Sequence, residues 1–122
     1  VELIDKFMTL KQKIYEGVGL FNQCKYNEAH IVWESIWKNG SELERLEIKG
    51  LIQLTGAILN SKSSKISSCK YLFKKSLSNI SNSLLIPQWV KVDPLLTSIK
   101  KALAELEERP YELILNIKII FR

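Results

Sequence analysis

The distribution of proline is the feature that most constrains the fold of this 122-residue chain. Its three prolines stand at positions 87, 94 and 110, so the first 86 residues contain none. Proline breaks a helix because its ring removes a backbone N–H and clashes with the preceding turn. Over the proline-free region, apolar residues recur three and four positions apart, which is the period of an amphipathic α-helix. The sequence therefore predicts an all-α protein, a compact bundle of about five helices.

Boundary signals place the first three of these helices. The first covers about residues 2–21, and the second covers about 26–38, where an Asn-Gly pair ends it. Ser41 and Glu44 have the spacing of a capping box, in which the hydroxyl and the carboxylate each accept a hydrogen bond from the other residue's backbone N–H. A third helix is therefore expected to begin after Ser41 and to continue to about residue 59.

The last two helices have weaker boundary signals. The fourth is expected to begin near Ser63 or Ser64 and to end near residue 80. A long connection follows over residues 81–92. Asp93 followed by proline is a strong helix start, because an acidic N-cap then precedes a proline in the first turn. The fifth helix begins there and ends before the third proline.

The C-terminal arm, residues 110–122, has a different pattern, with bulky and β-branched residues that alternate only in part. Three structures remain open for it: an extended arm lying on the bundle, a strand added in a dimer, or a short helix. We favour the extended arm.

Composition limits the class of protein. Hydrophobic residues make up 46% and charged residues 25%, as in an ordinary globular domain, and 122 residues fit a single domain. No apolar run approaches the roughly 18 residues that a membrane-spanning helix needs, and no export leader is recognisable. We therefore expect a cytoplasmic protein without a membrane partner, in which Cys24 and Cys69 are free thiols.

The second helix carries the most informative cluster of side chains. At about 100° per residue, five residues fall within roughly a third of its circumference: Tyr26, His30, Trp33, Glu34 and Trp37. A histidine and a glutamate on a face rich in tryptophan are unusual for a plain core stripe. Burying both costs several kcal/mol unless they are paired and hydrogen-bonded, so the cluster predicts a polar contact within a buried patch.

The partners of His30 follow from its position. Glu34 lies one turn further along the same helix and within reach, and Gln53, Asn60 and Asn22 are further candidates. We expect a binding cleft between the second and third helices. Its predicted residues are Tyr26, His30, Trp33, Glu34, Trp37 and Gln53.

Three segments of the sequence resemble a known family. The run GLFN at 19–22, the segment YNEAHIVWESIW at 26–37 and the run GLIQL at 50–54 look like the signature of the Domain of Unknown Function 309 family. The resemblance covers roughly residues 10–80. It implies a compact helical bundle of the kind found in small bacterial and plastid proteins, with no established activity. Members often carry a histidine near Leu59 or Asn60, and this sequence does not.

Metal binding and catalysis are the more specific functional hypotheses for the side chains clustered on the second helix. His30 and Glu34, four residues apart, could ligate one ion from a single helix face, but His30 is the sole histidine of the chain. We therefore expect no metal and no cofactor. The same two residues could act as an acid–base pair, so a small hydrolase, with or without a metal, is the alternative function. No nucleophile elbow or phosphate-binding glycine loop supports it.

Binding without catalysis is the favoured function. The net charge of +5 and the lysines around the fourth helix could serve nucleic acid, with Tyr71 and Phe73 as stacking rings, but solvated lysine faces are common and this partner is not favoured. Ile86, Trp89 and the C-terminal arm offer apolar surface that association would bury. The sequence thus favours a non-catalytic interaction or ligand-binding domain, with self-association or a protein partner.

Overall fold

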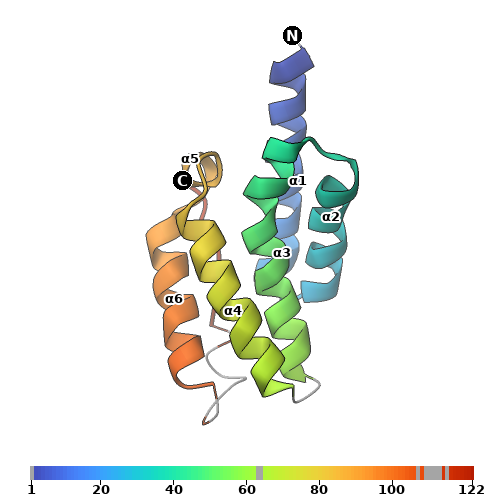
Figure 1. Cartoon of the computed structure of the whole chain (residues 1–122). Helices are drawn as coiled ribbons and strands as arrows, with labels where there is room; N and C mark the ends of the chain where they lie inside the picture. The colour runs from blue at the N-terminus through green and yellow to red at the C-terminus, as the bar shows by residue number, and fades with distance from the viewer. Residues whose placement is uncertain (1, 63–64, 107, 109–113, 115) are drawn as a thin grey trace.

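The computed structural model describes residues 2–62, 65–106, 108, 114 and 116–122, and this part of the chain contains six helices (Figure 1). The all-α prediction is confirmed. None of the described helices is both long and apolar enough to cross a bilayer. The helices are α1 (Glu2–Asn22), α2 (Tyr26–Asn39), α3 (Glu42–Lys62), α4 (Ile66–Ser81), α5 (Ile86–Trp89) and α6 (Val92–Ala104).

Helix α3 lies at the centre of the bundle, with α2 on one side and α4 on the other, while α1 packs on α2 and α6 on α4 (Figure 1). Its contact with α4 is close because Gly50 has no side chain. A Cβ there would lie 2.7 Å from Ile80 Cγ1 and 2.9 Å from the Ile80 backbone nitrogen. The Ser76 hydroxyl of α4 donates to the Gly50 carbonyl at 2.9 Å. The two helices are thus joined by backbone contact as well as by apolar packing.

The packing of α2 on α1 depends on a second glycine. Trp33 of α2 is fully buried, and a Cβ on Gly17 of α1 would lie 2.1 Å from its Nε1 atom. The indole therefore occupies the space that a side chain at position 17 would fill. Its Nε1–H is buried without a hydrogen-bond partner among the described residues. At this contact the indole is closely packed even though its N–H forms no hydrogen bond with the described residues.

The predicted boundary between α2 and α3 is confirmed. The Ser41 N–H donates to Glu44 Oε1 at 2.9 Å, and the Glu44 N–H donates to Ser41 Oγ at 3.3 Å, which completes the capping box. Gly40 follows the last residue of α2, but its φ of −85° is not left-handed. Glycine is needed there for space, because a Cβ would lie 2.5 Å from the Ile36 carbonyl oxygen.

The connection between α1 and α2 turns tightly, as predicted. Cys24 adopts the left-handed conformation with φ of 62°, and the Lys25 N–H donates to the Leu20 carbonyl at 2.9 Å. This geometry is that of a Schellman-type helix end, in which glycine is the usual left-handed residue.

Two predictions for the later part of the chain are corrected by the structure. The connection over 81–92 contains the single-turn helix α5, and the last helix begins at Val92, before Asp93. The Lys91 N–H donates to the Ile120 carbonyl at 2.8 Å, so α6 starts directly after a residue that is paired with the C-terminal arm. The predicted caps Ser63 and Ser64 lie outside the described residues.

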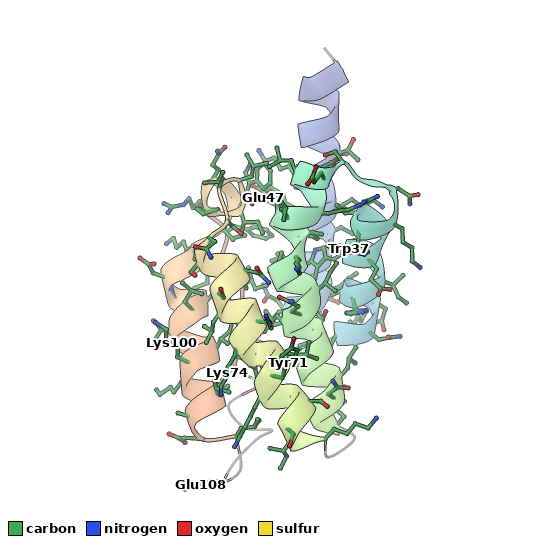
Figure 2. All side chains as sticks on the ribbon, in the orientation of Figure 1. Trp37, Glu47, Tyr71, Lys74, Lys100 and Glu108 are labelled. Carbon is green, nitrogen blue, oxygen red and sulfur yellow. The ribbon has the colours of Figure 1, made fainter. Side chains whose placement is uncertain are left out.

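Glu47 of α3 holds the connection between α4 and α5. Its carboxylate is almost completely buried and accepts hydrogen bonds from three consecutive backbone N–H groups (Figure 2). These belong to Leu84 (2.8 Å), Leu85 (3.0 Å) and Ile86 (3.3 Å). The first N–H groups of a helix have no partner within the helix. Glu47 therefore acts as a cap for α5 from a distant part of the sequence.

The end of the C-terminal arm, residues 117–122, is extended and lies on the bundle of its own chain, as favoured from the sequence. The amide of Asn22 binds the backbone of Ile119 twice. Its Nδ2 donates to the Ile119 carbonyl at 2.8 Å, and its Oδ1 accepts from the Ile119 N–H at 2.9 Å. Val90 and Phe121 form an isolated antiparallel bridge. The end of the arm is thus paired within its own chain, and residues 110–113 and 115 of the arm lie outside the described residues.

The two glycines of α1 give the first prediction. We expect Gly17→Ala to lower the free energy of unfolding by about 1–3 kcal/mol or more, because the new methyl group overlaps the Trp33 indole. Gly19→Ala is the matched control in the same helix, since a Cβ there meets nothing within 4 Å. It should raise stability by about 0.5–1 kcal/mol through helix propensity. Urea unfolding of both variants measures the difference, and equal effects would contradict the packing described.

Asn22 gives a second prediction. Asn22→Ala removes both hydrogen bonds to the arm and should cost about 1–3 kcal/mol, with faster hydrogen exchange at the Ile119 amide. Asn27→Ala, at an exposed position of α2, should change stability by less than about 0.5 kcal/mol. Unchanged exchange at Ile119 in the Asn22 variant would show that the arm is held by other contacts.

Candidate functional site

Helix α2 presents two adjacent faces to the bundle. Its core face consists of buried residues spaced three and four apart: Tyr26, Ala29, Trp33 and Ile36. The face beside it carries His30, Glu34 and Trp37, which are one turn apart in succession and are only partly buried or exposed. Since α2 packs on α3 as well as on α1, the candidate site lies where this second face meets α3.

His30 is held by a hydroxyl group of α3. Its Nδ1 lies 2.7 Å from Oγ1 of Thr55, which is fully buried. The Thr55 Oγ1 also lies 2.9 Å from the Ile52 carbonyl and 3.3 Å from the Leu51 carbonyl. The Thr55 oxygen and Nδ1 of His30 are therefore joined by one short hydrogen bond between α2 and α3.

The other ring nitrogen of His30 faces Glu34. Its Nε2 lies 3.3 Å from Glu34 Oε1, and the two side chains are 21% and 40% exposed. This distance allows a hydrogen bond from the ring nitrogen to the carboxylate. An ion pair with this degree of exposure contributes little to stability, because water screens it. The contact with Thr55 is thus the stronger anchor of the imidazole.

A pocket opens next to this pair, between α2 and α3. Its volume is about 160 Å³, and its lining residues are Glu34, Trp37, Lys49, Ile52 and Gln53. Trp37 is 43% exposed and lies on α2 (Figure 2). Gln53 is fixed from the other side, since its Oε1 accepts from Nδ2 of Asn79 in α4 at 2.6 Å. The pocket combines an indole, one acidic group, one basic group and an oriented amide.

The remaining two predicted residues lie elsewhere. Tyr26 is buried against Phe21 of α1, with ring centroids 5.2 Å apart, and its hydroxyl donates to Cys24 Sγ at 3.4 Å. Burial raises the pKa of Tyr26 well above its usual range. Trp33 packs on Gly17. The predicted arc of α2 is wide enough to include parts of two faces, so the structure brings His30, Glu34, Trp37 and Gln53 together and directs the other two into the core.

Thr55 and Lys49 were not identified from the sequence. Thr55 stands four residues after Leu51 on the buried stripe of α3, where a polar side chain needs a hydrogen-bond partner. The position of Thr55 on this buried stripe could therefore have identified it from the sequence. The position of Lys49 could not, because a lysine between apolar residues is common on any solvated helix. The other candidate partners of His30 are used elsewhere: Gln53 binds Asn79 and Asn22 binds the arm.

Metal binding and thiol chemistry have little support among the described residues. Within the described residues, no three His, Cys, Asp or Glu side chains are grouped so that they could hold a metal ion. Both cysteines are free. Burial raises the pKa of the Cys69 thiol to about 11, so it is protonated at neutral pH and is a poor metal ligand or nucleophile. Cys24 is exposed at the opposite end of α2 from Trp37.

Glu34, His30 and Thr55 have the connectivity of a carboxylate–imidazole–hydroxyl chain. In hydrolases with such a chain, the hydroxyl oxygen attacks the substrate and must be open to it. Here Thr55 is fully buried in the middle of α3, and its hydroxyl bonds to carbonyls of its own helix. A substrate cannot reach this oxygen without displacing α2 from α3, so the arrangement is suited to joining helices.

A pair of variants separates the two contacts of His30. His30→Ala should cost about 1–2 kcal/mol, because it removes the hydrogen bond to buried Thr55. Glu34→Gln should cost less than about 0.5 kcal/mol, because the ion pair is exposed to water. Urea unfolding at pH 7 measures both values. Equal losses in the two variants would mean that the ion pair holds the imidazole.

Comparison with known proteins gives one similarity, to a family model. A search of curated proteins finds no match to the chain. Residues 14–71 match the family model described as Domain of unknown function (DUF309). This segment runs from the second half of α1 to the first turns of α4, and it includes the whole lining of the α2–α3 pocket. This match supports the resemblance to the family that was inferred from the sequence.

Proposed function

We propose that this protein is a non-catalytic binding domain and that the pocket between α2 and α3 is its recognition site. The observation that carries the proposal is the position of Trp37. Its indole is 43% exposed and lines a pocket that also contains Glu34 and Lys49. Tryptophan at such positions is typical of the residues that dominate binding energy at protein interfaces.

The size of the pocket indicates what it would receive. One water molecule takes about 30 Å³ in the liquid, so 160 Å³ corresponds to roughly five water molecules. Sites for drug-sized ligands and cofactors usually measure about 300–1,000 Å³. The volume of the pocket between α2 and α3 lies below this range, which favours one apolar side chain of a protein partner as its occupant.

The surface around the pocket is suited to a protein partner. Leu46 lies one turn before Lys49 on α3 and is largely exposed, as is Ile31 on α2. Exposed apolar residues next to a pocket of this kind are typical of an interface core. Glu34 and Lys49 supply one charge of each sign, which would pair with polar groups at the rim of the partner.

The alternative hydrolase has less support. His30 is engaged by Thr55 at one ring nitrogen and faces Glu34 at the other. The hydroxyl that would act as nucleophile is buried. A binding role needs none of these groups to move, because Trp37 and its neighbours are already open to a partner.

Titration with side-chain probes tests the proposal. N-acetyl amides of phenylalanine, leucine and arginine are added to ¹⁵N-labelled protein and followed by NMR. We expect the apolar probes to shift the indole N–H of Trp37 and the side-chain amide of Gln53, with a Kd on the order of 1 mM for ligands this small. Trp37→Ala should abolish the response at Gln53. Trp89→Phe is the control, because Trp89 lies on α5 and does not line the pocket.

Two outcomes would contradict the proposal. One is the absence of shifts at Trp37 and Gln53 with every probe at millimolar concentration. The other is hydrolysis of p-nitrophenyl acetate above the background rate that His30→Ala removes and Trp37→Ala retains. A change from dimer to monomer in Trp37→Ala, measured by light scattering, would identify a second copy of the chain as the partner.

A further inference from the structure

A second groove lies between α4 and α6, away from the pocket described above. Its volume is about 340 Å³. Figure 2 labels Lys74 on α4 and Lys100 on the neighbouring helix α6. The lining residues are Lys74, Leu77, Ser78 and Ser81 of α4 with Leu96 and Lys100 of α6.

The charge of this groove is unbalanced. Lys74 and Lys100 stand on opposite walls, and no acidic residue lines the space between them. Neither lysine forms an ion pair with a residue in the described ranges, whereas Lys13 on α1 pairs with Glu16 at 3.7 Å. Two like charges on facing walls repel each other unless an anion lies between them. The groove is therefore complementary to an anionic group.

The other lining residues add a hydrogen-bond donor and an apolar floor. The Ser81 hydroxyl donates to the Ser78 carbonyl at 2.9 Å. The Ser78 hydroxyl has no hydrogen bond within the described part of the chain, so it remains available to a ligand. Leu77 and Leu96 are partly buried and pack against the core. An anion bound by the lysines would thus lie next to apolar surface.

The volume limits the class of ligand. At about 30 Å³ for each water molecule, the groove corresponds to roughly eleven waters, or a ligand with a similar number of non-hydrogen atoms. A phosphate group accounts for five atoms, which leaves room in the groove for an attached group. Lysine is a common phosphate ligand because its ammonium acts as a compact charge.

We propose that the α4–α6 groove binds a phosphate monoester with a small apolar or aromatic ester group. The phosphate lies between Lys74 and Lys100, with the Ser78 hydroxyl as a further donor. The ester group lies on Leu77 and Leu96. This site is separate from the pocket between α2 and α3 and does not depend on the function proposed for that pocket.

A nucleic-acid strand fits the same face less well. Proteins that bind single strands combine a basic groove with successive aromatic rings on which bases stack. Of the two rings of α4 considered for this role, Phe73 is fully buried, and Tyr71 is exposed with Lys75 Nζ 5.7 Å from its ring centroid. One exposed ring does not make a stacking path, so the observations favour a small ligand.

The test compares three probes on the full chain by ¹⁵N NMR at constant ionic strength: phenyl phosphate, inorganic phosphate and a single-stranded octanucleotide. We expect phenyl phosphate to shift the amides of residues 74–81 and 96–100 in a saturable way and to bind more tightly than inorganic phosphate. Lys74→Ala and Lys100→Ala should each weaken it about tenfold, the loss expected for one charge-assisted hydrogen bond. Lys38→Ala removes one exposed positive charge on α2 and should leave the affinity unchanged.

Three results would overturn the inference. Equal binding of inorganic and phenyl phosphate would show that the apolar floor is not used. Tighter binding of the octanucleotide, with shifts that extend to Lys75 and Lys101, would identify a nucleic-acid surface instead. Shifts that never saturate, or that Lys38→Ala reduces as much as Lys74→Ala, would indicate diffuse attraction to a basic protein. Circular dichroism shows whether each variant keeps its helices, which is expected because both lysines are exposed.

Discussion

The contact between the Trp33 indole and the backbone of Gly17 fixes the rotation of α2, and the site depends on that rotation. Trp33 is the largest of the fully buried side chains, and it fits against α1 only where that helix has no side chain. At about 100° per residue, His30, Glu34 and Trp37 lie roughly 40–100° around the helix from Trp33. With Trp33 directed at α1, this second face meets α3, where His30 contacts Thr55 and where Glu34 and Trp37 line the pocket.

Helix α3 is joined to three neighbours by polar side chains that sit among its apolar ones. Thr55 binds His30 of α2, Gln53 binds Asn79 of α4, and Glu47 binds the backbone before α5. Each such hydrogen bond contributes only about 1 kcal/mol net, while a buried partner left alone costs more. Apolar burial therefore supplies most of the stability, and these polar contacts determine the register in which the helices pack.

Local signals were enough to predict much of the fold. The helical stripes and the capping box at Ser41 and Glu44 depend on residues close together in sequence, and the bulky, partly alternating pattern of the arm favoured its extended form. The single turn of α5 was missed although Pro87 stands in its first turn, because the cap of its N-terminus, Glu47, comes from a distant part of the sequence. Part of the site was also predicted from local spacing, because the helical period placed Glu34 and Trp37 on one face of α2. The period could not distinguish this face from the neighbouring core face that carries Tyr26.

Glu47 and Asn22 share a property that distinguishes the irregular segments of this protein from its helices. Each uses a side chain where a neighbouring strand or a local cap would ordinarily supply the backbone partner. The shape of residues 84–86 is therefore encoded 37 positions earlier, on a different element. Substitutions at residues 84–86 should be tolerated as long as their backbone N–H groups can still donate to the Glu47 carboxylate. Substitution of Glu47 would remove all three hydrogen bonds at once. Because Glu47 binds only the backbone of this connection, the side chains there can vary while the backbone keeps one conformation.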